Sequence, residues 1–211
     1  MITIKKFIFN GFQVNTYLLY DETKECIIID AANYDVNEDA VLSNFIEKEK
    51  LKPVAQIYTH CHIDHILGSA FVEKQYNIGM GIHSEGKGFL MNASNQATMY
   101  GFNLKSTAQA TSLINEGDKI TFGNSELDVI YTPGHADGSI CFINHAQKFV
   151  LSGDVLFHES IGRTDLPTGN FELLHKNIVN KLFSLSDAYV VYPGHGPETS
   201  IGHEKMNNPF L

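Results

Sequence analysis

The chain has 211 residues, a length that suits one domain, so we predict a single domain spanning residues 1–211. Fifteen basic against 24 acidic residues give a net charge of −9, which argues against a nucleic-acid surface and against docking on an anionic membrane. Hydrophobic residues form 43% of the chain and charged residues 18%, a balance typical of globular rather than disordered proteins.

Three cysteines, Cys26, Cys61 and Cys141, are odd in number and far apart, so we expect no disulfide framework. Lys5 and Lys6 interrupt the apolar run that a signal peptide would need, and no window is long and apolar enough for a transmembrane helix. The expected location is a reducing cytoplasm.

The first half of the chain alternates strand and helix patterns. Asp35 lies three residues before Glu38, an arrangement similar to a capping box, and it begins a predicted helix that Pro53 terminates. The apolar face of this helix is predicted to hold Val41, Leu42, Phe45 and Ile46. The other elements expected here are strands at 14–20, 26–29 and 54–58, a helix at 66–76, and a short helix followed by a loop within 83–111.

The second half is rich in strand patterns. Asn170 is a suitable N-cap for a helix over 170–183, whose apolar residues recur at helical spacing. Strands are expected at 119–122, 127–131, 140–143, 149–151 and 188–192. Strands interleaved with helices favour a layered α/β sandwich.

Four predicted strands end in the same way, with an apolar run, a turn and then a side chain that can bind a metal. These side chains are His60, His135, Asp154 and His195. Residues just beyond buried strands lie on loops at the edge of a sheet, where rigid scaffolds display chemistry. If the four edges face one another, these side chains meet at one point.

The densest cluster is His-Cys-His-Ile-Asp-His at residues 60–65. In an extended segment, the side chains of His60, His62 and Asp64 would project to one side, while His65 would begin a helix and approach from another direction. This spacing suits two adjacent metals, the first bound by His60 and His62 and the second by Asp64 and His65.

Imidazole and carboxylate ligands suit zinc, iron or manganese, and a site without thiolates resembles a catalytic centre more than a closed structural one. Cys61 is expected to point away from the ligands and to pack in the core. The remaining histidines are expected to be ordinary surface or core residues: His83, His145, His158, His175 and His203.

These motifs resemble the metallo-β-lactamase superfamily. Its H-x-H-x-D-H signature is present at residues 60–65, and its later ligands are present in Thr-Pro-Gly-His135, Ser-Gly-Asp154 and Pro-Gly-His195. The segments 161–165, 193–199, 204–205 and 208–210 are similar to the short glyoxalase II-like hydrolases of that family. The resemblance implies an αββα sandwich of the α/β class with metals at one edge of the two sheets.

The resemblance also implies the ligand sets of two divalent ions, with zinc preferred and iron or manganese as alternatives. One ion would take His60, His62 and His135, and the other would take Asp64, His65 and His195, with Asp154 and a hydroxide between them. True β-lactamases of this fold commonly carry cysteine or serine at the position of Asp154, which argues against that activity.

The reaction expected from this resemblance is hydrolysis of a thioester by the metal-bridging hydroxide, with Asp64 orienting the attacking water. The chain ends soon after His195, whereas full-length glyoxalase II carries a further helical domain that helps to bind glutathione. The expected substrate is S-2-hydroxyacylglutathione or a similar small anionic acyl thiol. Arg163 is the candidate anchor for a substrate carboxylate, unless it pairs with Asp165 to fix a turn.

Two alternatives stay open. A mononuclear iron dioxygenase acting on persulfides, another branch of the superfamily, would need only His60, His135 and Asp154. A non-enzymatic metal-binding protein of the same fold is the third possibility.

Overall fold

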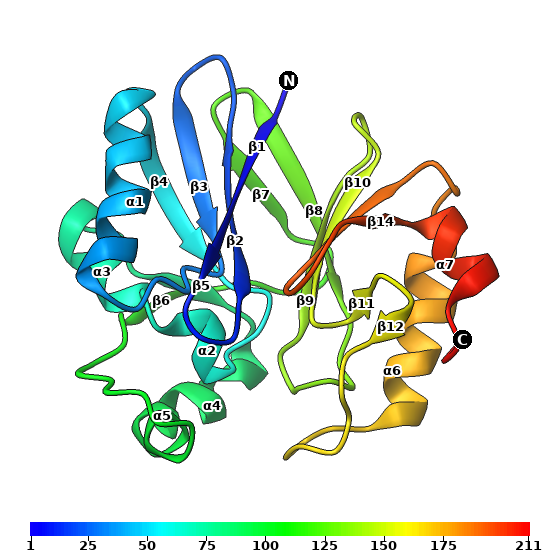
Figure 1. The fold of residues 1–211 in the computed structure, drawn as a ribbon. Helices are drawn as coiled ribbons and strands as arrows, with labels where there is room; N and C mark the ends of the chain where they lie inside the picture. The colour runs from blue at the N-terminus through cyan, green and yellow to red at the C-terminus, as the bar shows by residue number, and fades with distance from the viewer.

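Two six-stranded sheets face each other in the computed structural model, which describes residues 1–211 (Figure 1). The first sheet has the order β1 (Thr3–Phe9), β2 (Val14–Tyr20), β3 (Glu25–Ile29), β4 (Lys52–Ile57), β5 (Met80–Ile82) and β6 (Ala110–Leu113). The second has the order β14 (Thr199–Ser200), β13 (Val190–Pro193), β10 (Phe149–Gly153), β9 (Ile140–Asn144), β8 (Ser125–Tyr131) and β7 (Lys119–Phe122).

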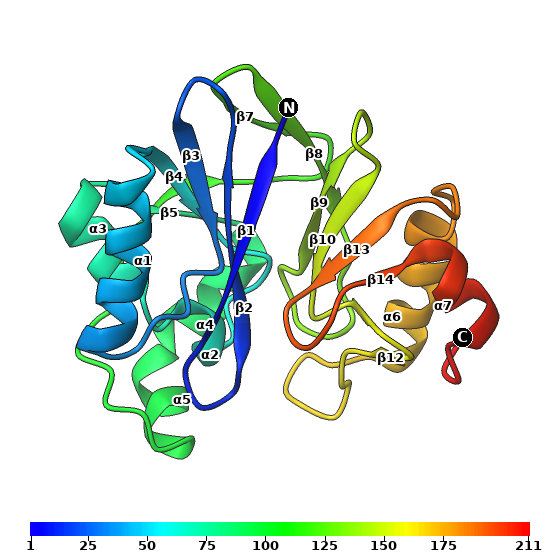
Figure 2. The same ribbon diagram turned by 45° about the horizontal axis from the view of Figure 1, so that its top comes forward.

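Helices cover the outer face of each sheet, so the predicted αββα sandwich is confirmed (Figures 1 and 2). The first sheet is covered by α1 (Val36–Lys48) and α3 (Ser69–Tyr76), and the second by α6 (Phe171–Asn177), its π-helical continuation (Ile178–Leu182) and α7 (Ile201–Asn207). Toward one end of the molecule lie a 3-10 turn (Ser84–Gly86) and three short helices, α2 (Ile63–Ile66), α4 (Lys87–Met91) and α5 (Ala93–Met99). A small separate hairpin is formed by β11 (Leu156–Phe157) and β12 (Ser160–Ile161). None of these helices has the length and apolar character needed to cross a membrane.

Side-chain alternation along the strands explains the layers. In β3, Cys26 and Ile28 pack in the core beneath α1 and α3, whereas Ile27 and Ile29 pack in the core between the two sheets. A third core joins the second sheet to α6 and α7. Central strands buried on both faces are largely apolar, which is why segments such as β3 are recognisable in the sequence.

Some elements differ from the sequence-based expectation. Strands β1, β5 and β6 were not expected, and the helix predicted over 66–76 is two helices interrupted at Leu67 and Gly68. Pro53 does not terminate α1, which ends at Lys48; it lies inside β4 at a shift in the strand register. Val41 is exposed on α1, so the buried face of that helix is narrower than predicted. All three cysteines are free and buried, which confirms the core packing expected for Cys61.

Strand direction brings several strand ends to one edge. β3 and β4 are parallel, as are β10 and β13, and β8 runs in the same direction as β10 because both are antiparallel to β9. The two sheets are joined at this edge by Asn15 and Tyr17 of β2. The Asn15 backbone N–H donates to the Gly194 carbonyl (2.7 Å), and the Tyr17 hydroxyl donates to the Pro193 carbonyl (2.8 Å).

Candidate metal centre

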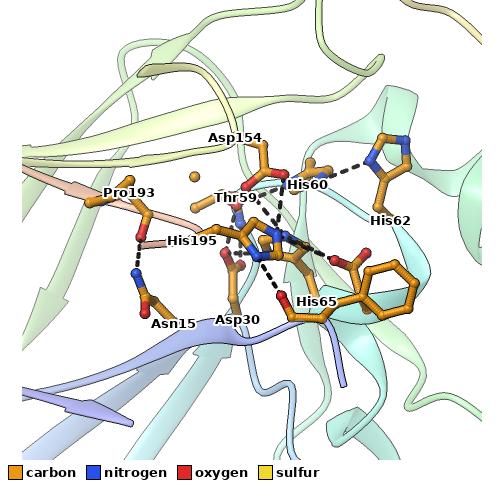
Figure 3. A network of polar contacts seen from close by, with 12 residues as sticks. Asn15, Asp30, Thr59, His60, His62, His65, Asp154, Pro193 and His195 are labelled. Atoms are coloured by element: carbon orange, nitrogen blue, oxygen red, sulfur yellow. Dashed lines mark hydrogen bonds and ion pairs between the residues drawn. The ribbon is translucent and has the colours of Figure 1, made fainter. Parts of the chain in front are cut away.

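The structure brings all seven predicted metal-binding side chains to this edge. Figure 3 labels five of them: His60, His62, His65, Asp154 and His195. The seven side chains come from the loops after β4, β8, β10 and β13 and from α2. One detail of the prediction is wrong: Asp64 does not lie in an extended segment, because α2 already begins at Ile63. His62 is the extended N-cap of that helix, so Asp64 and His65 both project from its first turn.

Three imidazoles form the first group. Nδ1 of His62 lies 3.1 Å from Nε2 of His60 and 2.9 Å from Nε2 of His135, and the three rings are nearly perpendicular to one another. The outer nitrogens have other partners: Nδ1 of His135 donates to the Arg163 carbonyl (2.8 Å), and Nδ1 of His60 contacts the Thr59 hydroxyl (3.1 Å). Because Nδ1 of His135 donates its proton to a carbonyl group, Nε2 of the same ring keeps a free lone pair. This Nε2 faces the centre of the group.

Asp64, His65 and His195 form the second group. Nε2 of His195 lies 3.4 Å from Asp64 Oδ2, and Nε2 of His65 lies 3.7 Å from the same oxygen. The Nδ1 atoms again face outward, because that of His195 donates to the Phe12 carbonyl (3.0 Å) and that of His65 bonds to Asp30 (3.0 Å). Both groups coincide with the ligand sets that the family resemblance implies.

Asp154 lies between the two groups. Its Oδ1 is 3.4 Å from Nε2 of His65, and its Oδ2 is 3.6 Å from Nε2 of His135 and 3.5 Å from Nε2 of His195. Nε2 of His65 and Oδ1 of Asp154 are buried without any hydrogen-bond partner. Unpartnered buried polar atoms are costly, and here they face each other within a set of imidazole and carboxylate donors. The donor set therefore fits divalent cations, one on each side of Asp154.

The pKa values of the metal-free chain differ between the two groups of histidines. Burial and the neighbouring histidines hold the pKa of His60 well below its usual value, and burial lowers the pKa of His62 to about 3, so both imidazoles are neutral and have a lone pair available for a cation. Burial works against ionisation of Asp154, but the charges and hydrogen bonds of His65 and His195 together outweigh it and hold the pKa of Asp154 well below normal. Burial likewise opposes a charge on His195, yet hydrogen bonds to Asp154 and Asp64 raise its pKa to about 9. A cation that binds at neutral pH must therefore displace a proton from His195.

Asp30 is a buried supporting residue that the sequence analysis did not identify. Its carboxylate accepts hydrogen bonds from the Thr59 N–H (2.7 Å) and the Thr59 hydroxyl (2.7 Å) and pairs with Nδ1 of His65 (3.0 Å). A carboxylate on the far nitrogen of a ligating histidine fixes the tautomer and orientation of the ring. The signal was present, because Asp30 directly follows the apolar strand β3 just as Asp154 follows β10.

A cavity of about 800 Å³ opens above this centre. Its floor includes His62, Asp64, His135, Asp154 and His195. Its walls are largely apolar or aromatic and include Phe12, Phe89, Met99, Tyr100, Phe157 and Leu166. The cavity is therefore large enough for a molecule of several functional groups and places an apolar part of it against the walls.

The turn between β1 and β2 contributes to both floor and wall. The main-chain carbonyl of Phe12 supports His195, while the Phe12 ring lines the cavity and packs edge-on against Tyr100, with 5.6 Å between ring centroids.

Arg163 also lines the cavity, and it forms a two-pronged ion pair with Asp165. Arg163 Nε and Nη2 lie 2.7 Å from the two carboxylate oxygens, and both side chains are more than half exposed. This is the turn-fixing contact that the sequence analysis considered as the alternative to substrate binding.

Comparison with known proteins identifies the family. Residues 9–195 match the metallo-beta-lactamase superfamily model, and the chain belongs to that superfamily. It is 36% identical to the probable metallo-hydrolase YqgX of Bacillus subtilis (94% of this chain, 92% of that one) and 34% identical to the hydroxyacylglutathione hydrolase GloC of Haemophilus influenzae (95% and 94%). These relatives support a metal-dependent hydrolase.

Solved structures agree. The chain superposes on the BLEG-1 B3 metallo-beta-lactamase with a TM-score of 0.87 at 34% identity, covering 99% of each chain. It superposes on TTHA1623 in a di-iron-bound form with a TM-score of 0.88 at 28% identity (98% of this chain, 100% of that one), and on ETHE1 from Myxococcus xanthus with a TM-score of 0.79 at 26% identity (98% and 83%).

Asp30→Asn should weaken metal binding about 10–100-fold, because the amide no longer holds His65 as a carboxylate does. The measurement is zinc competition against a chromophoric chelator. Asp21→Asn is the matched control, since Asp21 is also buried and accepts hydrogen bonds, but in the turn between β2 and β3. Equal metal affinity in the two variants would show that Asp30 has no role at the centre.

Gly194→Ala should lose bound metal while keeping its fold, because a Cβ at this position would collide with the Asp154 carboxylate and lie 2.8 Å from Cε1 of His65. Metal content after dialysis and circular dichroism test this. Gly11→Ala, at a turn position with no atom within 4 Å of the added methyl group, should retain full metal content. If both variants retain it, the close approach of residue 194 to the centre is unimportant.

Proposed function

We propose that this protein is a metal-dependent hydrolase of acyl thioesters, similar to glyoxalase II, with two divalent metal ions, zinc preferred. The observation that carries the proposal is the complete set of seven ligand-type side chains, five of which line the floor of a large cavity, with two buried atoms of the set unpartnered. The similarity to a hydroxyacylglutathione hydrolase supports the choice of thioesters.

Divalent cations at this centre supply Lewis acidity, which lowers the pKa of water toward neutrality and polarises a carbonyl group. The chain itself supplies the positions. His60, His62 and His135 would hold one metal ion. Asp64 lies on the other side of the centre, where its carboxylate can accept a proton from the attacking water and so orient the lone pair of that water toward the carbonyl carbon.

The leaving group needs little help from the protein. A thiol has a pKa near 8.5, so a thiolate departs without a strong general acid. The apolar walls of the cavity exclude water from the uncharged part of the substrate, and Phe89 packs edge-on against His62 at a ring distance of 4.9 Å. A thioester with an apolar segment next to its reactive carbonyl suits this arrangement.

The test is turnover by metal-loaded protein across thioester, lactone, phosphodiester and β-lactam substrates, with metal content measured in the same preparation. Thioesters should be hydrolysed fastest, and Asp154→Ala should lose metal stoichiometry and about 100-fold or more of kcat/KM together. The β-lactam is included because of the similarity to BLEG-1. No turnover of any substrate by fully loaded protein would favour a non-enzymatic metal-binding role.

The similarity to ETHE1 supports persulfide dioxygenation as the second candidate. His60, His135 and Asp154 would suffice for a single iron, whereas Asp64, His65 and His195 would then have no ligand role. One iron per chain together with persulfide-dependent oxygen uptake, and no thioester turnover, would establish this alternative and exclude the hydrolase.

The role of Arg163 is tested by breaking its ion pair from either side. If Arg163 anchors a substrate carboxylate, Arg163→Ala should raise KM several-fold for acidic thioesters and leave neutral ones unchanged. Asp165→Ala should lower KM for the acidic substrates, because it frees the guanidinium. Equal changes for acidic and neutral substrates in both variants would instead support a structural ion pair.

A further inference from the structure

A second cluster of metal-type side chains lies away from the cavity floor. His158 and Glu159 form the turn between β11 and β12, and His203 projects from α7. The two imidazole rings stack with 4.9 Å between centroids and 16° between planes. Oε1 of Glu159 lies 3.0 Å from Nε2 of His203 and 3.9 Å from Nε2 of His158, so both ring nitrogens face one carboxylate.

A buried carboxylate fixes this arrangement. Glu204 is 1% exposed, and its Oε2 accepts hydrogen bonds from the Glu159 N–H (2.9 Å) and from the Asn208 side chain (2.8 Å). Glu204 directly follows His203 in α7, so one helical turn carries the imidazole and also anchors the loop that carries the other two side chains. Glu159 is held at φ +52, a left-handed conformation that non-glycine residues seldom adopt without such support.

We propose that His158, Glu159 and His203 form a third divalent-metal site, separate from the two groups on the cavity floor. Two imidazoles and one carboxylate suit zinc, nickel, cobalt or copper, and hard cations such as magnesium and calcium are disfavoured because they prefer oxygen ligands. The three side chains are 36–50% exposed, so the remaining coordination positions are open to water.

A metal at this site cross-links the β11–β12 hairpin to α7. His158 lines the large cavity, and the preceding residue, Phe157, lies with its ring 6.3 Å from that of His195. The site would therefore stabilise one wall of the cavity without contributing to its floor. The inference does not depend on the reaction proposed above, because it concerns metal binding and stability only.

The test starts from protein whose central metals are already loaded and titrates it with zinc by calorimetry, with bound zinc per chain counted after dialysis. Wild-type protein should show one additional binding event and a higher melting temperature in zinc. His203→Gln should weaken the additional event about tenfold or more. His175→Gln, which removes another partly exposed histidine on α6, should leave it unchanged.

His158→Gln and Glu159→Gln provide independent tests from the hairpin side and should weaken the same event. Unaltered central metal content and an unaltered melting temperature in chelator would show that each variant is folded. The proposal is overturned if the loaded wild-type protein takes up no further zinc at concentrations that saturate the two central sites. It is also overturned if each of the three single variants still shows the additional binding event with unchanged affinity.

Discussion

The centre depends on one buried carboxylate. Asp30 is 1% exposed and has three donors around it, two from Thr59 and one from His65. Thr59 belongs to the loop after β4 and His65 to α2, so a single side chain at the end of β3 sets the positions of both segments that carry the H-x-H-x-D-H residues. A buried charge is tolerated only when its hydrogen bonds are satisfied, and this requirement makes the geometry of the loop and the helix rigid.

The sequence predicts those features that local pattern determines. Strands that are buried on both faces, such as β3 and β10, are largely apolar, and Asp154 directly follows β10. His60, His135 and His195 lie on the short loops that follow β4, β8 and β13. β1 was not predicted because it is an edge strand with exposed or half-buried positions on both faces, so Lys5 and Lys6 interrupt its apolar run. β5 and β6 are only three and four residues long, too short for a period to be recognised.

Other features depend on tertiary contacts that no local pattern encodes. The helix after residue 62 is interrupted at Gly68, where an added Cβ would lie in collision with the Asn33 side chain, 35 residues earlier in the sequence. The proximity of His158 to His203 arises from the hydrogen bond between the Glu159 backbone and Glu204. The sequence predicts the ion pair of Arg163 with Asp165 as one of two possibilities, because a separation of two residues in a loop allows it. Local pattern does not decide between this pairing and substrate binding.

In the turn between β1 and β2, the main chain and the side chain of Phe12 have different roles. The main chain of Phe12 supports His195 through its carbonyl group, whereas the side chain of Phe12 contributes only to the cavity wall. Every amino acid has the same carbonyl group, so this position can be occupied by side chains of other sizes without removal of the histidine's partner. Substitutions at this turn would therefore alter which molecules the cavity admits while the main-chain support of His195 is left intact.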